Sequence, residues 1–288
     1  MNAVGPRVVT VSPGWLALRE PADAAARAID LVARVGHLLP ARRPVVVHDL
    51  GCGTGSMARW LAPQLPGPQH WVMYDRDADL LARAAVDVPL LSADGSPVTV
   101  ETRRRDITRL DQHDLAGASL ITASALLDML TAVEVERIAR SCAETGCLVL
   151  LTLSVIGEIS LTPSDPLDEV IASAFNEHQR RAGDEGRLLG PDAVGFAADV
   201  FARLGAEVVL APSPWRLGAS DTALTTEWFQ GWVGAACEQR PELTASTQAY
   251  VERRLADAAA GRLRVTVRHQ DLLAVPRESP PGEEPRDR

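Results

Sequence analysis

Three glycines after a run of β-formers carry the first chemical signal in this sequence. Residues 45–48 read as a buried strand, and Gly51, Gly53 and Gly55 then form a turn in which no side chain blocks a ligand. Helical periodicity resumes at Met57, so the turn opens a helix whose backbone amides favour an anionic group. The spacing therefore predicts a ligand-binding loop at the end of this strand.

Two acids narrow the class of ligand. Asp75 ends the next predicted strand, residues 71–74, where a carboxylate can accept hydrogen bonds from a ribose diol. A dinucleotide-binding loop would have Gly or Ala at position 56, whereas this chain has Ser56. Asp49 precedes the first glycine, where it would repel a pyrophosphate but could bind an ammonium group. A nucleoside ligand without phosphates therefore fits better than a dinucleotide.

These motifs resemble those of the class I S-adenosylmethionine (SAM)-dependent methyltransferases, which have a strand, an acid and G-x-G-x-G, followed by an acid after the next strand. The resemblance continues at the ends of the third and fourth predicted strands and covers about residues 20–212. It implies SAM as the cofactor and S-adenosyl-L-homocysteine (SAH) as the product. The residues that it assigns to cofactor binding are Arg19, Asp49, Gly51, Gly53, Gly55, Asp75, Arg76, Asp106, Ile107 and Ser124.

The fold that this resemblance implies is α/β, a Rossmann-like doubly wound sheet of seven strands, mostly parallel with an antiparallel last strand. A helical substrate cap is expected in addition, from the length of the segment before the last strand. Residues 147–154 read as a strand covered on both faces, and Thr131 with Glu134 forms a capping box for the helix before it. A first helix is expected from about Pro21 to Pro40. The expected segments are a helical region over the cofactor at 1–43, a core at 44–212, a helical cap at 213–261, a final strand at 262–275 and a disordered tail at 276–288.

The cap is predicted because about fifty residues separate the sixth and last strands, too many for a hairpin loop. Two helices are expected there, at residues 222–237 and 244–259. Trp215, Trp228 and Trp232 could line a pocket for a planar apolar substrate, although an aromatic stripe at helical spacing also suits ordinary packing.

Methyl transfer from a sulfonium mainly requires alignment, and a base is needed only when the acceptor must lose a proton. Asp128 and His178 are the candidate bases. Asp128 could equally brace the next helix, and His178 could be a structural histidine. Because Asp128 has no adjacent Asn of the kind expected in a magnesium-dependent catechol enzyme, we expect a metal-independent reaction.

Charge and composition bear on partners and location. The formal net charge of −9 disfavours a nucleic-acid partner, and the four scattered cysteines suit a reducing cytoplasm better than a disulfide framework. No 18-residue apolar span occurs, so we expect neither export nor membrane insertion. The prediction is a cytoplasmic methyltransferase that acts on a small molecule, with aromatic and secondary metabolites as candidates. An RNA or protein methyltransferase and a non-catalytic SAM-binding partner protein are the alternatives, and a homodimer stays open.

Overall fold

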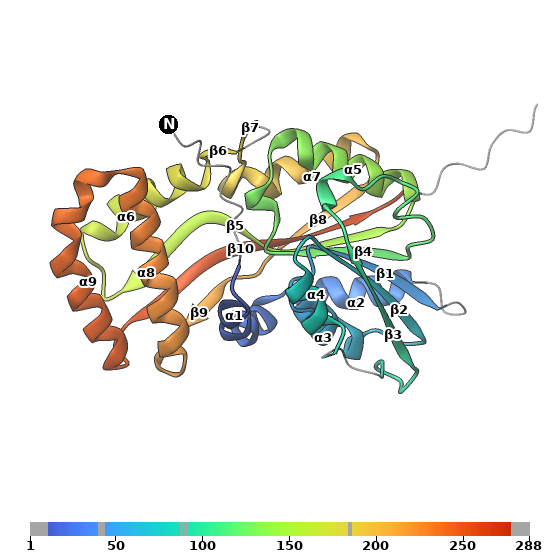
Figure 1. Cartoon of the computed structure of the whole chain (residues 1–288), viewed down its shortest axis with the longest axis horizontal. Helices are drawn as coiled ribbons and strands as arrows, with labels where there is room; N and C mark the ends of the chain where they lie inside the picture. The colour runs from blue at the N-terminus through green and yellow to red at the C-terminus, as the bar shows by residue number, and fades with distance from the viewer. Residues whose placement is uncertain (1–10, 40–43, 87, 89–90, 184–185, 278–288) are drawn as a thin grey trace, which may run out of the picture.

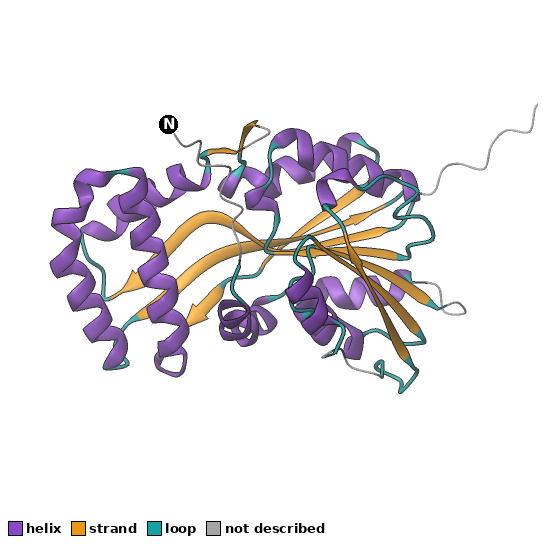
Figure 2. Cartoon of the chain, viewed as in Figure 1, coloured by secondary structure: helices purple, strands orange, loops and turns teal. Residues whose placement is uncertain are grey.

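The computed structural model describes residues 11–39, 44–86, 88, 91–183 and 186–277. In this part of the chain, one mixed sheet runs the length of the molecule and helices cover both of its faces (Figure 1, Figure 2). None of the described helices is both long and apolar enough to cross a membrane. The predicted disordered tail lies outside the described residues from residue 278 onward.

The large sheet contains eight strands in the order β3-β2-β1-β4-β5-β10-β8, with β9 paired to β10. Its strands are β1 (Val45–Leu50), β2 (Gln69–Asp75), β3 (Val98–Arg104), β4 (Leu120–Ser124), β5 (Leu148–Thr162), β8 (Glu207–Pro212), β9 (Trp215–Leu217) and β10 (Arg264–Val275). The first five are parallel, whereas β10 runs antiparallel between β5 and β8. This arrangement confirms the predicted Rossmann-like fold and its antiparallel last strand; β9 is an additional strand. A separate short hairpin pairs β6 (Ala182–Gly183) with β7 (Gly186–Arg187).

Helices pack on the two faces of the sheet and form two separate apolar clusters with it. The helices are α1 (Pro13–Ala26), α2 (Ile29–Leu38), α3 (Ser56–Leu61), α4 (Ala78–Ala84), α5 (Ala132–Thr145), α6 (Leu167–Gln179), α7 (Ala193–Arg203), α8 (Thr222–Gln239) and α9 (Thr244–Ala259). Short 3-10 helices lie at Ala62–Gln64, Ile107–Arg109, Leu127–Met129, Gly190–Asp192, Ala219–Asp221 and Pro241–Leu243. Helices α5 and α7 contribute to one cluster, and α2, α3 and α4 to the other. The capping box predicted at the start of α5 is confirmed.

The prediction of a single N-terminal helix from about Pro21 was wrong. Helix α1 already begins at Pro13, because the Ser12 hydroxyl caps it by accepting a hydrogen bond from the Trp15 amide at 3.0 Å. Pro21 lies inside this helix. The chain leaves the helical conformation at Arg27 (φ −55°, ψ 138°) and re-enters it at α2. This break places Arg27 at a corner between two helices.

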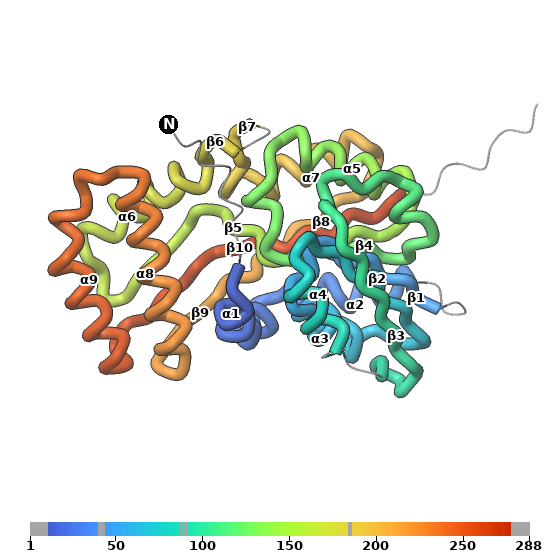
Figure 3. The backbone as a smooth tube through the Cα atoms, in the orientation of Figure 1, coloured from blue at the N-terminus to red at the C-terminus, as the bar shows by residue number. Residues whose placement is uncertain are grey.

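Strands β5 and β10 are much longer than the core requires and connect it to the cap (Figure 1, Figure 3). Strand β5 was predicted to end near residue 154 but continues to Thr162, paired with β10. The outer halves of these strands carry α6, α8 and α9, which share a third apolar cluster that includes Ile171, Phe229 and Tyr250. Helix α6 thus joins the two predicted cap helices in one helical cap with a core of its own.

Gly157 lies in β5 where this strand leaves the core, and its backbone requires a glycine. Its φ is +76°, and an added Cβ would lie 2.9 Å from the Asn176 amide nitrogen and 3.0 Å from Pro191. We expect Gly157→Ala to lower the free energy of unfolding by about 2 kcal/mol. The matched variant Gly195→Ala, in helix α7 with no heavy atom within 4 Å, should raise it by up to about 1 kcal/mol. Urea unfolding of both variants is the measurement, and a Gly157→Ala chain as stable as the unsubstituted chain would contradict this account.

Candidate active site

The glycine loop joins β1 to α3 at the carboxyl edge of the sheet. Gly51, Gly53 and Gly55 all have positive φ, between 55° and 86°. An added Cβ would lie 3.2 Å from the Leu126 side chain at Gly51 and 3.2 Å from the Leu16 side chain at Gly53. Both the backbone conformation and the close neighbours therefore require residues without side chains here.

Asp75 holds this loop against the end of β2. One of its carboxylate oxygens accepts a hydrogen bond from the Gly53 amide at 2.9 Å, and the other accepts one from the Asp77 amide at 2.9 Å. A carboxylate offers about two acceptor positions on each oxygen. Asp75 can therefore anchor the loop and still accept hydrogen bonds from a ligand.

Three further predicted cofactor residues lie beside Asp75 at the same sheet edge. Asp106 follows β3 and accepts hydrogen bonds from the Thr108 amide at 3.0 Å and hydroxyl at 2.7 Å. Ile107 beside it is buried. The Arg76 carbonyl accepts a hydrogen bond from the Arg104 side chain at 3.0 Å, which ties the ends of β2 and β3 together. The structure thus brings these residues to one rim of the sheet.

Arg27 is a residue of this edge that the sequence did not single out. Its side chain is only 4 % exposed, and one terminal nitrogen donates to the Ser124 hydroxyl at 3.1 Å and to the Ser56 hydroxyl at 3.4 Å. The Nε and Nη1 atoms have no hydrogen-bond partner within the described residues. Buried, unpaired donors on a charged group are costly, so this guanidinium is suited to an anionic ligand. The only local signal for it is an Arg inside the alanine-rich stretch 22–28.

Asp49 supplies the opposite charge at the same edge. It is 1 % exposed, and one carboxylate oxygen accepts a hydrogen bond from the Thr122 hydroxyl at 2.7 Å. Its other oxygen has no partner within the described part of the chain. Burial raises the pKa of Asp49 to about 7, against the opposing effects of the Thr122 hydrogen bond and the Arg27 charge. The edge therefore presents free guanidinium donors and a free carboxylate oxygen, which complement the carboxylate and ammonium groups of an amino acid.

The raised pKa of Asp49 predicts a pH dependence of folding in the ligand-free chain. Because the fold favours the neutral carboxyl, this stabilisation is complete below about pH 4 and is lost as the pH rises to about 7. The loss is on the order of 4 kcal/mol at most, since each pKa unit corresponds to about 1.4 kcal/mol. Urea unfolding across this pH range should show that Asp49→Asn removes that part of the slope. The same slope in both proteins would mean that Asp49 ionises normally.

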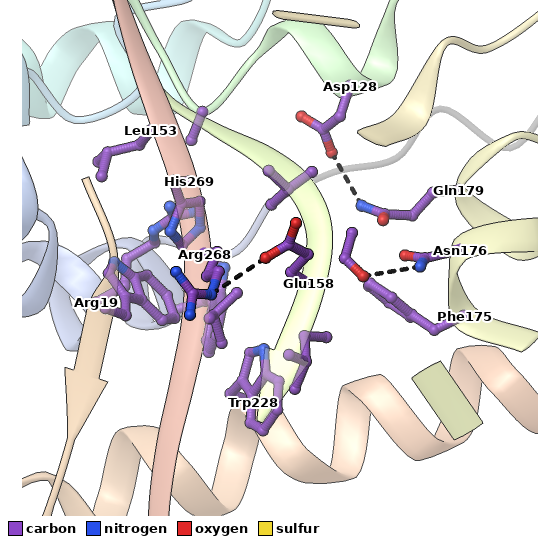
Figure 4. Close-up of a pocket in the computed structure, with 17 residues that line it drawn as sticks. Arg19, Asp128, Leu153, Glu158, Phe175, Asn176, Gln179, Trp228, Arg268 and His269 are labelled. Carbon is purple, nitrogen blue, oxygen red and sulfur yellow. Dashed lines mark hydrogen bonds and ion pairs between the residues drawn. The ribbon is translucent and has the colours of Figure 1, made fainter. Parts of the chain in front are cut away.

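A cavity of about 170 Å³ opens beside this edge, between the core and the cap. Its walls come from α1, β5, α6, α8, β9 and β10, and it meets the core at Ala125, Asp128 and Leu153 (Figure 4). Ala125 and Leu153 have φ of 51° and 57°, which is uncommon for residues with side chains and typical of functional sites. The cavity therefore lies where two residues with strained backbone, one just after β4 and one within β5, face the cap.

The cavity brings together several of the predicted substrate residues. Trp215 and Trp228 line it, whereas Trp232 stacks behind Trp228 with ring centroids 5.3 Å apart and is buried in the cap core. Asp128 also lines it, and burial raises the pKa of this carboxyl. His178 is not among the lining residues; its Nε2 lies 3.2 Å from a Glu238 carboxylate oxygen.

Arg19 and His269 also line the cavity. Arg19, which was predicted to bind the cofactor, lines the cavity and donates two hydrogen bonds to the Asp23 carboxylate at 2.9 and 3.1 Å. His269 lines the cavity from β10 and was not predicted. Burial lowers the pKa of His269 to about 3, so its ring is neutral. An isolated His in a strand gives no sequence signal for such a site.

Comparison with known proteins identifies the domain. Residues 47–146 match the family model described as a methyltransferase domain, and no curated protein matches the chain. The cyclopropane synthase MmaA2 from Mycobacterium tuberculosis is similar at 12% identity, over 92% of this chain and 94% of that one, with a TM-score of 0.49. A SAM-dependent methyltransferase from Geobacter sulfurreducens, solved with SAH, is 16% identical over 92% and 99%, with a TM-score of 0.42. Magnesium protoporphyrin IX methyltransferase from Synechocystis PCC 6803, solved with SAH, is 13% identical over 72% and 83%, with a TM-score of 0.41.

The matched segment contains the glycine loop, Asp75 and the sheet edge that carries Asp49 and Ser124. Around it lies a mostly parallel sheet whose last strand, β10, runs antiparallel between β5 and β8, as the resemblance to class I methyltransferases implied. Residues 47–146 of this chain therefore form a methyltransferase domain within a Rossmann-like fold.

Proposed function

We propose that this enzyme transfers the methyl group of SAM to a small molecule bound in the cavity between core and cap, without a metal. The observation that carries the proposal is the pair of buried, incompletely bonded groups at the sheet edge, the Arg27 guanidinium and the Asp49 carboxylate. The amino-acid portion of SAM carries a carboxylate and an ammonium group, so its site needs one group that binds an anion and one that binds an ammonium. Arg27 and Asp49 supply these two groups. Arg27 donates to Ser56 just after the glycine loop, and Asp49 lies in β1 just before this loop.

The residues at this edge fit SAM from end to end. Arg27 Nε and Nη1 would donate to its carboxylate, and the free Asp49 oxygen would accept from its ammonium group. Asp75 would accept from the ribose hydroxyls while it holds Gly53. The adenine would lie toward Arg76, Asp106 and Ile107 at the ends of β2 and β3. When bound, SAM supplies a methyl group that is already activated by a positively charged sulfur.

The acceptor cavity adjoins this cofactor edge through neighbouring residues. Ser124 accepts a hydrogen bond from Arg27, and the next residue, Ala125, lines the cavity. A molecule held in the cavity would therefore face the amino-acid end of the cofactor, and its main requirement is alignment and exclusion of water. The cap helices and α1 provide that enclosure.

The volume of the cavity and the net charge of the chain favour a small-molecule acceptor over RNA or a protein. The cavity measures about 170 Å³, and the formal net charge is −9. The open cavity that Trp215 and Trp228 help to line also favours catalysis over a purely cofactor-binding role, because a non-catalytic cap would be expected to fill that space.

Calorimetric titration of the full chain with SAM, SAH, adenosine and NAD tests the proposal. We expect saturable binding of SAM and SAH, much weaker binding of adenosine because it lacks the amino-acid end, and no binding of NAD. Failure of folded, ligand-free protein to bind SAH would overturn the proposal. Tight NAD binding would instead support a dinucleotide enzyme.

A further inference from the structure

Two side chains on α6 that line the cavity carry a hydrogen-bond acceptor that has no donor within the described residues. The Asn176 and Gln179 side-chain oxygens are buried and without a partner within the described residues. Their amide orientations are set, because the Asn176 nitrogen donates to the Gly157 carbonyl at 2.9 Å and the Gln179 nitrogen donates to Asp128 at 3.4 Å. Three positions apart on α6, they share one helix face. Figure 4 shows both near Asp128 at the same side of the cavity.

The charges around the cavity leave one carboxylate unneutralised. Arg19 is paired with Asp23 at 2.9 Å, and Arg268 is paired with Glu158 at 3.2 Å. Asp128 accepts a hydrogen bond from Gln179 but forms no ion pair within the described part of the chain, and Arg19 and Arg181 act on it only at longer range. The polar side of the cavity is therefore electronegative and rich in acceptors, which suits a cation with several N–H donors.

The remaining wall suits a flat apolar group. Phe175 lies beside Asn176 in Figure 4, Trp228 lines the cavity farther from Asp128, and Trp15 and Trp215 complete the aromatic lining. Aromatic faces also attract a cation held close to them. The free volume of about 170 Å³ is similar to that of a protein cavity of about 150 Å³ that holds benzene. One ring with a short substituent therefore fits.

We propose that the methyl acceptor is a small arylalkyl primary amine whose ammonium group is bound by the Asp128 carboxylate and the Asn176 and Gln179 oxygens. This inference rests on the methyltransferase function proposed above. Three acceptors match the three N–H bonds of an ammonium group. Asp128 is also the base, because a protonated nitrogen has no lone pair for attack.

Methyl transfer to the amine needs only Asp128 as the proton acceptor and SAM as the methyl donor. The ammonium group gives one proton to Asp128, and the freed nitrogen lone pair forms a bond to the methyl carbon. The methyl–sulfur bond breaks, and its electron pair goes to the sulfur. The products are an N-methylated ammonium ion, SAH and a protonated Asp128, which releases its proton to solvent.

The test is calorimetric binding of benzylamine, benzyl alcohol and benzoate to the SAH-loaded full chain near neutral pH. These probes share a ring and differ in the polar group. We expect benzylamine to bind at least ten-fold more tightly than either of the others. Asp128→Asn should remove that preference, whereas the matched variant Asp199→Asn, an exposed carboxylate on α7, should keep it. Gln179→Met, which lacks the acceptor oxygen, should weaken benzylamine binding several-fold and keeps the test intact should Asp128→Asn fold poorly.

Other outcomes overturn the inference. Equal or tighter binding of benzyl alcohol would assign a hydroxyl acceptor, and tightest binding of benzoate would mean that Arg19 leaves Asp23 to bind an anion. Binding of none of the probes by protein that still binds SAH would reject this acceptor class and leave the methyltransferase function standing. Failure of the unsubstituted chain to bind SAH would instead reject the proposed function itself.

Discussion

Replacing Arg27 by Gln is expected to weaken SAH binding by about 100-fold or more. The guanidinium would lose two charge-assisted hydrogen bonds to the ligand carboxylate, each worth about 1.5–3 kcal/mol, and about 1.4 kcal/mol corresponds to a factor of ten in affinity. Calorimetric titration with SAH measures the loss. Adenosine, which has no carboxylate, should bind the variant and the unsubstituted chain about equally.

Arg34→Gln is the matched control for this experiment. Arg34 lies on α2, and its partly exposed side chain pairs with Glu207 at the start of β8, 2.6 Å away. Its removal should change SAH affinity less than two-fold, because an exposed ion pair contributes little. Unchanged SAH affinity in Arg27→Gln would show that another group holds the carboxylate, with Arg19 as the next candidate.

Replacing Asp75 by Ala should also weaken SAH binding by about 100-fold or more. This carboxylate has two functions, since it anchors the Gly53 amide and offers acceptors to the ribose. Asp75→Asn keeps one acceptor oxygen, so a smaller loss of about ten-fold is expected. Titrations of both variants with SAH and with adenosine give the comparison, and here adenosine binding should fall together with SAH binding.

Asp94→Ala separates loop anchoring from ligand binding. Asp94 also holds a loop, through the Gly67 amide at 3.0 Å and the Ser92 hydroxyl at 2.7 Å, but it precedes β3 at the opposite edge of the sheet. This variant should lower stability and leave SAH affinity within two-fold of the unsubstituted chain. An equal loss of affinity in Asp94→Ala and Asp75→Ala would mean that Asp75 acts only through the stability of the fold.

The sequence by itself determined the features that depend on neighbouring residues. The glycine loop, the acid at the end of β2 and the capping box of α5 are local patterns, because left-handed backbone and helix caps are set within a few positions. The sheet and its antiparallel last strand were implied by the resemblance of these motifs to those of the class I SAM-dependent methyltransferases, and the structure confirms both. The two cap helices were found from the same kind of local periodicity.

Only the tertiary structure decided which charged residues are available to ligands. Arg19 and Arg27 lie two helical turns apart, yet Arg19 is paired with Asp23 whereas Arg27 is buried against Ser124 with unpaired donors. In the same way, the cavity exists because β5 and β10 extend beyond the core and place α6 opposite Asp128. Burial and partner choice arise from contacts between residues far apart in sequence, and these contacts set both the pKa and the free hydrogen-bonding capacity of each group.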